Sequence, residues 1–156
     1  MPPGFLGTNA DLLMDIVLVS FAVILPLLVI SWRQARAKDY AGHKRTQVGL
    51  GIGLAIVVAI FEADLSLSGG IFVLTEASAY AGTTVLKSWI YGHTVVAILT
   101  SLVWAVLIIL SLVKFESPPA PNAFSGVHML LGRTGMILMM ATGLSAFPLY
   151  YYGFYS

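Results

Sequence analysis

The chain has 156 residues, of which 58% are hydrophobic and 10% are charged, and its mean hydropathy is +0.91. This balance is typical of an integral membrane protein and excludes an ordinary soluble domain. No basic patch is interleaved with aromatic residues, which argues against nucleic-acid binding. The absence of cysteine excludes disulfide bonds, thiolate metal sites and nucleophilic cysteine catalysis. The length allows about four membrane spans of ~20 residues each.

The first long apolar run predicts a membrane helix over residues 11–32. Thr8 or Asn9 is expected to cap this helix, and Asp11 and Asp15 lie in the first turns, where acidic side chains interact favourably with the helix dipole. The preceding segment lacks the basic region of a cleavable signal peptide, so we expect the run to stay in the bilayer.

The connection to the next apolar run holds five of the eight basic residues, which are Arg33, Arg36, Lys38, Lys44 and Arg45. Basic residues in short loops are retained on the cytoplasmic side during insertion. We therefore expect this loop to be cytoplasmic and both chain termini to lie on the outer side of the membrane.

The second span is predicted over residues 43–67, and it ends at a pair of glycines. Gly49 and Gly53 form a small-xxx-small pair, where we expect a neighbouring helix to approach closely. The loop 68–85 contains no basic residue, as expected for the outer side, and it has room for a short interfacial helix.

The third span is predicted over residues 86–113, with aromatic residues at its entry and Lys114 at its exit. A proline-rich connection follows, and Ser125 is the expected N-cap of a fourth span over residues 127–152. The sequence therefore predicts an all-α polytopic membrane protein. Residues 1–156 form a single four-transmembrane-helix bundle with both termini outside.

Helical phase places two neighbouring stripes on the fourth span. His128, Gly132, Gly135 and Met139 share one stripe, and its glycines leave room either for a planar cofactor or for close helix packing. Arg133 shares the adjacent stripe with three methionines, whose thioethers suit Cu(I) or simply adaptable core packing. For both stripes we favour the packing interpretation over a cofactor or copper site.

Depth in the membrane separates the remaining ionisable residues into two groups. His43 and His128 lie at the cytoplasmic ends of their helices, with Arg133 about 7.5 Å deeper, and are candidate cofactor ligands. His93 lies near the outer end with Glu62 and Asp64, and these three are candidate metal ligands. Solvated or structural roles remain alternatives for each, because the cost of an ionisable group falls towards the interface.

Four segments carry a resemblance to a known family, namely PPGFLGTNADLLMD, YAGHKRTQVGLG with FEADL, HTVVAILTSLVW and FSGVHMLLGRTG. Over essentially its whole length the chain resembles the bacterial membrane family called domain of unknown function 420, which includes proteins of the YozB and CtaM type. The most specific feature is the ordered set His43, His93 and His128, followed by Arg133.

The resemblance implies a bacterial inner-membrane protein that acts in maturation of haem-copper terminal oxidases, with the three histidines as candidate ligands. Three hypotheses follow. The first is a non-enzymatic assembly factor that handles copper, and the second is a b-type haem electron carrier with His43 and His128 as axial ligands. The third is a structural accessory subunit of a respiratory or photosynthetic complex. The residue spacing gives no support to hydrolysis, phosphoryl transfer or transport.

Overall fold

The computed structural model describes residues 2–155 and consists, over that range, of helices and connecting segments without a β-strand. Four helices are long and apolar enough to span a membrane, namely α1 (Leu12–Arg36), α2 (Tyr40–Leu67), α4 (Thr84–Lys114) and α5 (Ser125–Phe154). The predicted all-α membrane bundle of four spans is therefore confirmed. A short helix, α3 (Ile71–Leu74), lies in the loop where the sequence left room for one.

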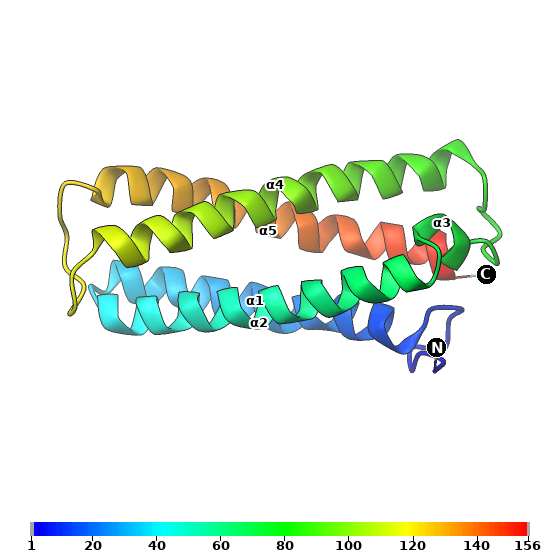
Figure 1. Cartoon of the computed structure of the whole chain (residues 1–156), viewed down its shortest axis with the longest axis horizontal. Coiled ribbons are helices and arrows are strands. Elements are labelled where there is room, and N and C mark those ends of the chain that lie inside the picture. The colour runs from blue at the N-terminus through cyan, green and yellow to red at the C-terminus, as the bar shows by residue number, and fades with distance from the viewer. Residues whose placement is uncertain (1, 156) are drawn as a thin grey trace.

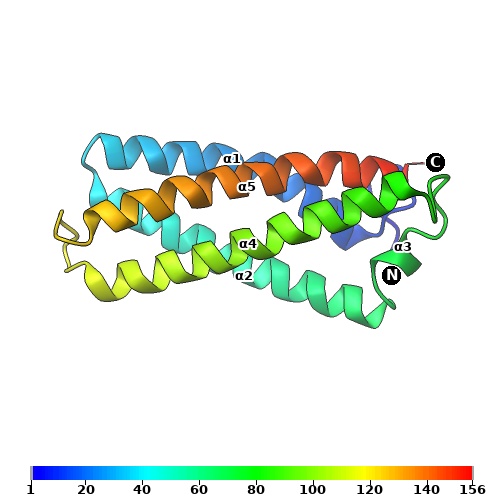
Figure 2. The same cartoon turned by 90° about the horizontal axis from the view of Figure 1, so that it is seen from above.

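The four long helices lie side by side, with both ends of the chain at the same end of the bundle (Figure 1). The closest packing is of α4 against α5 and of α1 against α2, so the bundle is built from two helix pairs. Seen from above, α4 crosses α2 at an angle instead of running along it (Figure 2). Contacts between the pairs are correspondingly fewer.

The core is a narrow apolar seam where the two helix pairs meet. Its buried members come from all four long helices and are Phe21, Ile24, Leu28, Leu50, Trp104, Met139 and Ala146. Most other large apolar side chains of the described chain face outward along the whole length of the bundle. An apolar surface of this extent fits a lipid environment and not water, so the fold is that of a multi-pass membrane protein.

Close helix contacts occur at glycines other than the predicted pair. A Cβ at Gly135 would lie 3.0 Å from Trp104, and one at Gly143 would lie 3.0 Å from Phe21. A Cβ at Gly49 or Gly53 would have no neighbour within 4 Å, so the prediction of a close approach there was wrong. On α2 the glycine that faces a neighbour is Gly51, which meets Ile108 of α4.

Two predicted helix caps were also wrong. Asp11 caps α1 by accepting an amide hydrogen bond at 2.9 Å, so neither Thr8 nor Asn9 does so. Ser125 is the first residue of α5 and not its cap, because its hydroxyl accepts a hydrogen bond from the amide of Asn122 in the preceding turn. Short polar side chains cap helices interchangeably, so the local path of the backbone decides between neighbouring candidates.

The helices extend beyond the predicted spans 11–32, 43–67, 86–113 and 127–152 at most ends. Asp39 and Thr83 accept amide hydrogen bonds as N-caps, and α2 and α4 therefore begin two or three residues before the apolar runs do. Hydropathy marks the lipid-facing part of a helix, whereas the hydrogen-bonded helix continues into the interface until a cap ends it.

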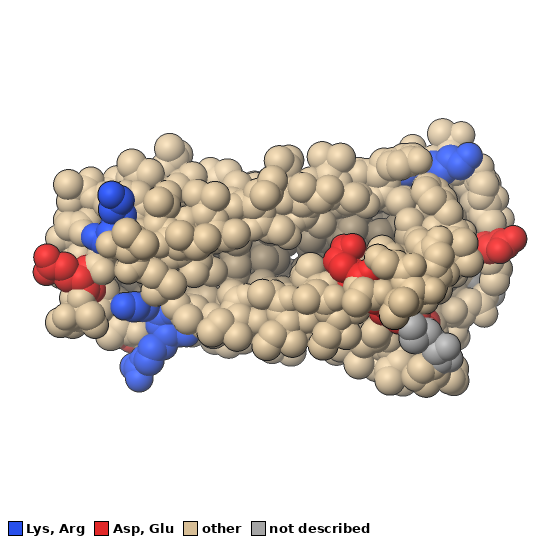
Figure 3. All heavy atoms as spheres, in the orientation of Figure 1, with Lys and Arg blue, Asp and Glu red and all other residues tan. Residues whose placement is uncertain are grey.

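Lysine and arginine side chains gather at the end of the bundle opposite the termini (Figure 3). This end carries the α1–α2 and α4–α5 connections, and its basic residues are Arg33, Arg36, Lys38, Lys44, Arg45 and Lys114. We call it the basic end, and the opposite one the terminal end. Lys87 is the one basic residue at the terminal end within the described chain.

Candidate functional site

His43 and His128 meet at the basic end of the bundle. Their ring centroids lie 6.0 Å apart and the ring planes are almost perpendicular, at 87°. His43 belongs to α2 and His128 to α5, so the contact joins the two helix pairs. The structure thus brings together the two residues that depth alone had placed at the same level.

Each histidine stands in the first turn of its helix, where the backbone fixes its position. The amide of His43 donates to the carbonyl of Asp39 at 3.0 Å, and the carboxylate of Asp39 caps the amide of Gly42 at 2.9 Å. Gly42 must lack a side chain, because a Cβ there would collide with that carboxylate. The amide of His128 likewise donates to the carbonyl of Phe124 at 3.0 Å.

Nδ1 of His43 carries a proton. It lies 2.9 Å from the carbonyl oxygen of Ser31 and 2.8 Å from the hydroxyl of the same residue. A carbonyl oxygen only accepts hydrogen bonds, so Nδ1 must be the donor. Ser31 is completely buried and its hydroxyl also accepts a hydrogen bond from Gln47 at 2.9 Å. The ring is therefore held from α1, with Nε2 left as the nitrogen that bears a lone pair.

A second serine holds His128. The Ser111 hydroxyl lies 2.6 Å from the carbonyl of Leu107 and 2.9 Å from Nδ1 of His128. When this hydroxyl donates to the carbonyl, its oxygen accepts a hydrogen bond from a protonated Nδ1. No hydrogen bond within the described chain involves Nε2 of either histidine. The site thus presents two imidazole lone pairs from two helices.

Aromatic side chains surround the His128 ring. Its centroid lies 5.2 Å from that of Phe115 and 6.3 Å from that of Phe124, at the two sides of the α4–α5 connection. Arg133 is exposed and has no hydrogen bond or ion pair within the described chain. Of the predicted cofactor-binding set, the structure joins His43 with His128, and Arg133 does not hydrogen-bond to either.

The glycine stripe below His128 faces α4. Buried Trp104 lies directly against Gly135, and Leu107 lies 4.0 Å from a Cβ at Gly132. At Gly135 the expected close helix packing is therefore present. On the neighbouring stripe Met129 and Met140 are exposed, at 53% and 43%, so these thioethers point out of the bundle and not into its core.

His93 occupies a separate position on α4. Its Nδ1 lies 2.9 Å from the Ser145 hydroxyl, which donates to the carbonyl of Thr142 at 3.0 Å. Ser145 follows His128 by seventeen residues on α5, about 25 Å by helical rise. His93 therefore lies far from the His43–His128 pair, in agreement with its predicted depth near the other end of the bundle.

The predicted outer metal ligands are not joined to one another. Glu62 is exposed and Asp64 is 5% exposed, and no hydrogen bond or ion pair in the described chain links either to His93. One carboxyl oxygen of Asp64 is buried without a hydrogen-bond partner among the described residues. Within residues 2–155 there is no group of three or more histidine, aspartate and glutamate side chains placed to hold a metal ion.

A second buried carboxylate, that of Asp15, lies at the terminal end of the bundle. Asp15 is completely buried and accepts hydrogen bonds from the amides of Phe5 and Leu6, at 2.5 and 2.7 Å. It also accepts a short hydrogen bond from the hydroxyl of Tyr150 in α5. Both oxygens of this carboxylate are thus used to tie the N-terminal segment to the bundle, which makes its role structural.

Comparison with protein-family models, with curated proteins and with solved structures finds no match to this chain. Function is therefore argued from the geometry of the site.

The sequence reasoning overlooked the serines that hold the histidines. Ser31, Ser111 and Ser145 lie in apolar helices, each at the depth of the histidine that it contacts. Their depth along the helices would have identified these serines, because it matches the depth of the histidines. A hydroxyl inside a span forms hydrogen bonds with a neighbouring helix or with its own backbone, and a histidine at the same level is the strongest available partner.

The paired imidazoles have the chemistry of a metal site with an incomplete set of ligands. Neutral imidazole nitrogen binds zinc, copper, iron and nickel. A histidine metal ligand usually donates its other N–H to a carbonyl or another acceptor, which orients the ring. Nδ1 of His43 and Nδ1 of His128 are each hydrogen-bonded to a serine residue in this way. The two ring centroids lie 6.0 Å apart, so the two imidazoles are neighbours at the same end of the bundle.

Proposed function

We propose that this protein is a non-enzymatic membrane accessory factor that carries copper during the maturation of a haem-copper terminal oxidase. The observation that carries the proposal is the His43–His128 pair, in which Nδ1 of each ring is hydrogen-bonded to a serine residue and Nε2 has no hydrogen-bond partner within the described chain. The resemblance of the whole chain to the family of domain of unknown function 420 supports the choice of process and of a bacterial inner membrane.

The small number of ligands favours transfer over storage. Structural zinc sites use four protein ligands and catalytic ones use three, whereas the histidine pair supplies two. Cu(I) accepts nitrogen and soft sulfur ligands, and an ion held by two imidazoles keeps positions open for ligands from a partner protein. A copper ion delivered to an oxidase needs such an open position, because the ligands must be exchanged one at a time.

Haem is the less favoured occupant of the same pair. The aromatic side chains of Phe115 and Phe124 already pack against the His128 ring. Trp104 fills the neighbouring space at Gly135. A Soret band in the purified protein after haem supplementation would nevertheless establish haem binding and contradict the copper proposal.

Copper binding is tested on the full chain in detergent by titration with Cu(I) against a chromophoric chelator. We expect one equivalent to bind, and His43→Ala and His128→Ala each to weaken binding by at least tenfold, because each removes half of the ligands. His93→Ala is the matched control, since it removes the same side chain from the other end of the bundle and should leave the affinity unchanged. Equal affinity in all four proteins contradicts the proposal.

The role in assembly is tested by deleting the gene and measuring the partner oxidase. We expect the oxidase subunits to remain in the membrane while their copper content and activity fall, and wild-type protein but not His43→Ala to restore both. Unchanged copper content in the deletion strain would rule out a role in copper delivery even if the purified protein binds the metal.

A further inference from the structure

A cavity of about 350 Å³ lies at the basic end, beside the last turns of α1 and the connection to α2. It is lined by Ile30, Arg33 and Gln34 of α1 and by Ala37 and Asp39 of the connection. Ile30 is 48% exposed and stands three residues before Arg33, about 4.5 Å nearer to the middle of the bilayer. The cavity therefore extends from the apolar part of the membrane into the polar interface.

Two hydrogen-bond donors that line this cavity are free. Arg33 is exposed and forms no hydrogen bond or ion pair through its side chain within the described chain. The side-chain oxygen of Gln34 accepts a hydrogen bond from Thr46 at 3.0 Å, while its amide nitrogen has no partner among the described residues. A guanidinium group without a carboxylate partner is well suited to hold a phosphate.

A second arginine lies close to the first. The guanidinium carbon of Arg36 lies 5.1 Å from the centre of the Trp32 ring, which is a cation–π contact within α1. Trp32 is 45% exposed, and tryptophan is enriched at the level of lipid headgroups. Arg36 follows Arg33 by three residues, and side chains with this spacing are neighbours on a helix. Two positive charges thus lie together at headgroup level.

The protein does not neutralise the charge around this cavity. Residues 32–45 hold five basic side chains and one acidic side chain, that of Asp39. None of the five basic side chains forms an ion pair within the described chain. One carboxylate oxygen of Asp39 accepts the amide hydrogen bond that caps α2. The end of α1 disfavours an anion and the start of α2 favours one, so the side-chain charges decide which ligand binds.

We propose that this cavity binds the headgroup of one anionic phospholipid, such as phosphatidylglycerol. Arg33 holds the phosphate with the Gln34 amide beside it, Arg36 adds a second positive charge, and an acyl chain lies along Ile30. Clusters of roughly four to eight basic residues next to a membrane span are typical of proteins that bind anionic lipids. The site does not depend on the histidine pair or on the proposed function.

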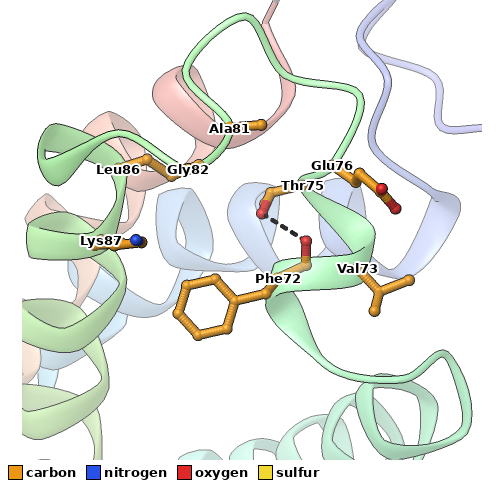
Figure 4. Close-up of a pocket in the computed structure, with 8 residues that line it drawn as sticks. All are labelled: Phe72, Val73, Thr75, Glu76, Ala81, Gly82, Leu86 and Lys87. Atoms are coloured by element: carbon orange, nitrogen blue, oxygen red, sulfur yellow. Dashed lines mark hydrogen bonds between the residues drawn. The ribbon is translucent and has the colours of Figure 1, made fainter.

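A cavity at the terminal end offers a comparison within the same molecule (Figure 4). Its volume is similar, about 360 Å³, and its charged lining residues are Lys87 and Glu76. Figure 4 shows Lys87 on α4 and the Glu76 carboxylate on the far side of α3. One basic and one acidic residue give this cavity no excess of positive charge, so we expect no preference for an anionic lipid there.

The experiment uses the full chain reconstituted into vesicles of equal amounts of phosphatidylglycerol and phosphatidylcholine. After mild extraction into detergent, native mass spectrometry counts each lipid that remains bound. We expect the wild type to retain one phosphatidylglycerol in preference to phosphatidylcholine. Arg33→Gln should lower this preference about fivefold, the effect of one basic residue near an anionic surface. Equal retention of the two lipids by the wild type overturns the proposal.

Asp39→Asn tests the charge of the cavity in the opposite direction. Asparagine caps helices as well as aspartate does, so α2 should keep its first turn while the cavity loses the negative charge of Asp39. Retention of phosphatidylglycerol should therefore rise above that of the wild type. A fall in retention would show that the carboxylate helps to hold the lipid, and it would contradict an anionic headgroup.

Two lysines outside the cavity serve as matched controls. Lys114 is exposed at the basic end and Lys87 is exposed at the terminal end, so Lys114→Gln and Lys87→Gln each remove one positive charge elsewhere. Neither should lower the preference for phosphatidylglycerol as Arg33→Gln does. An equal loss in Lys114→Gln would show that the basic end as a whole attracts the lipid, and it would overturn the assignment to this cavity.

Discussion

At the scale of single residues, one arrangement occurs three times. Nδ1 of each histidine is hydrogen-bonded to a serine residue, and the hydroxyls of Ser111 and Ser145 also donate a hydrogen bond to a backbone carbonyl of their own helix. Inside a medium of low dielectric constant, an unpaired ring N–H would be costly. The serine satisfies this group and at the same time fixes which nitrogen keeps a lone pair. The serines are therefore positioning residues for the imidazoles.

This role predicts the effect of Ser111→Ala. Without its acceptor, the His128 ring loses the preference for a proton at Nδ1, and we expect imidazole ¹⁵N NMR to show a mixture of tautomers in place of one. Copper affinity should fall by about 10- to 100-fold, as for other groups that orient metal ligands.

Ser101→Ala is the control for that change. Ser101 lies on the same helix, is exposed, and bonds only to the carbonyl of Ala97 in its own helix. It should leave both the tautomer and the affinity unchanged. A single Nδ1–H tautomer in Ser111→Ala would show that the serine does not fix the ring.

The residues of the site were only partly predictable from the sequence. Depth along each helix follows from counting residues, and it placed His43 level with His128 and far from His93. Contact also depends on how each helix is rotated about its axis. The spans are apolar all round, so hydrophobic periodicity does not fix that rotation. For this reason the serine partners and the exposed position of Arg133 appear only in the structure.

At the scale of helices, small residues decide where neighbours meet. Close contacts with a neighbouring helix occur at Gly51, Gly135 and Gly143. Gly49 and Gly53, by contrast, face outward. Length and hydropathy predicted the helices themselves, because a bilayer demands about 20 apolar residues per span. They did not predict the packing faces, because lipid and protein present equally apolar surroundings.

The difference between these glycines predicts opposite outcomes for one substitution. Gly135→Leu forces the buried Trp104 ring away and should destabilise the bundle by about 1–3 kcal/mol, as overpacking does elsewhere. Gly49→Leu adds a side chain where nothing lies within 4 Å and should not destabilise it. Unfolding in SDS, followed by tryptophan fluorescence, measures both. Equal midpoints for the two variants would contradict the assigned packing faces.

At the scale of the whole molecule, charge separates the two ends of the bundle. Six of the eight basic residues lie at the basic end (Figure 3). Retention of basic loops in the cytoplasm predicts that this end is inside and that both termini are outside. The histidine pair then lies near the cytoplasmic surface.

The absence of cysteine makes this orientation simple to measure. Ala79→Cys places a thiol in the exposed loop between α3 and α4, and Ala37→Cys places one in the exposed α1–α2 connection. A membrane-impermeant maleimide should label the first variant in intact spheroplasts and the second only after lysis. The reverse pattern would invert the predicted topology.

The crossing of α4 over α2 has a mechanical consequence. Gly51 and Ile108 meet where the two helices cross, and His43 lies eight residues from Gly51, about 12 Å along the helix. A tilt of α2 about this contact would therefore change the distance between the His43 and His128 rings. A partner protein that separated the two helix pairs at the basic end would also separate the two imidazoles without contacting either ring.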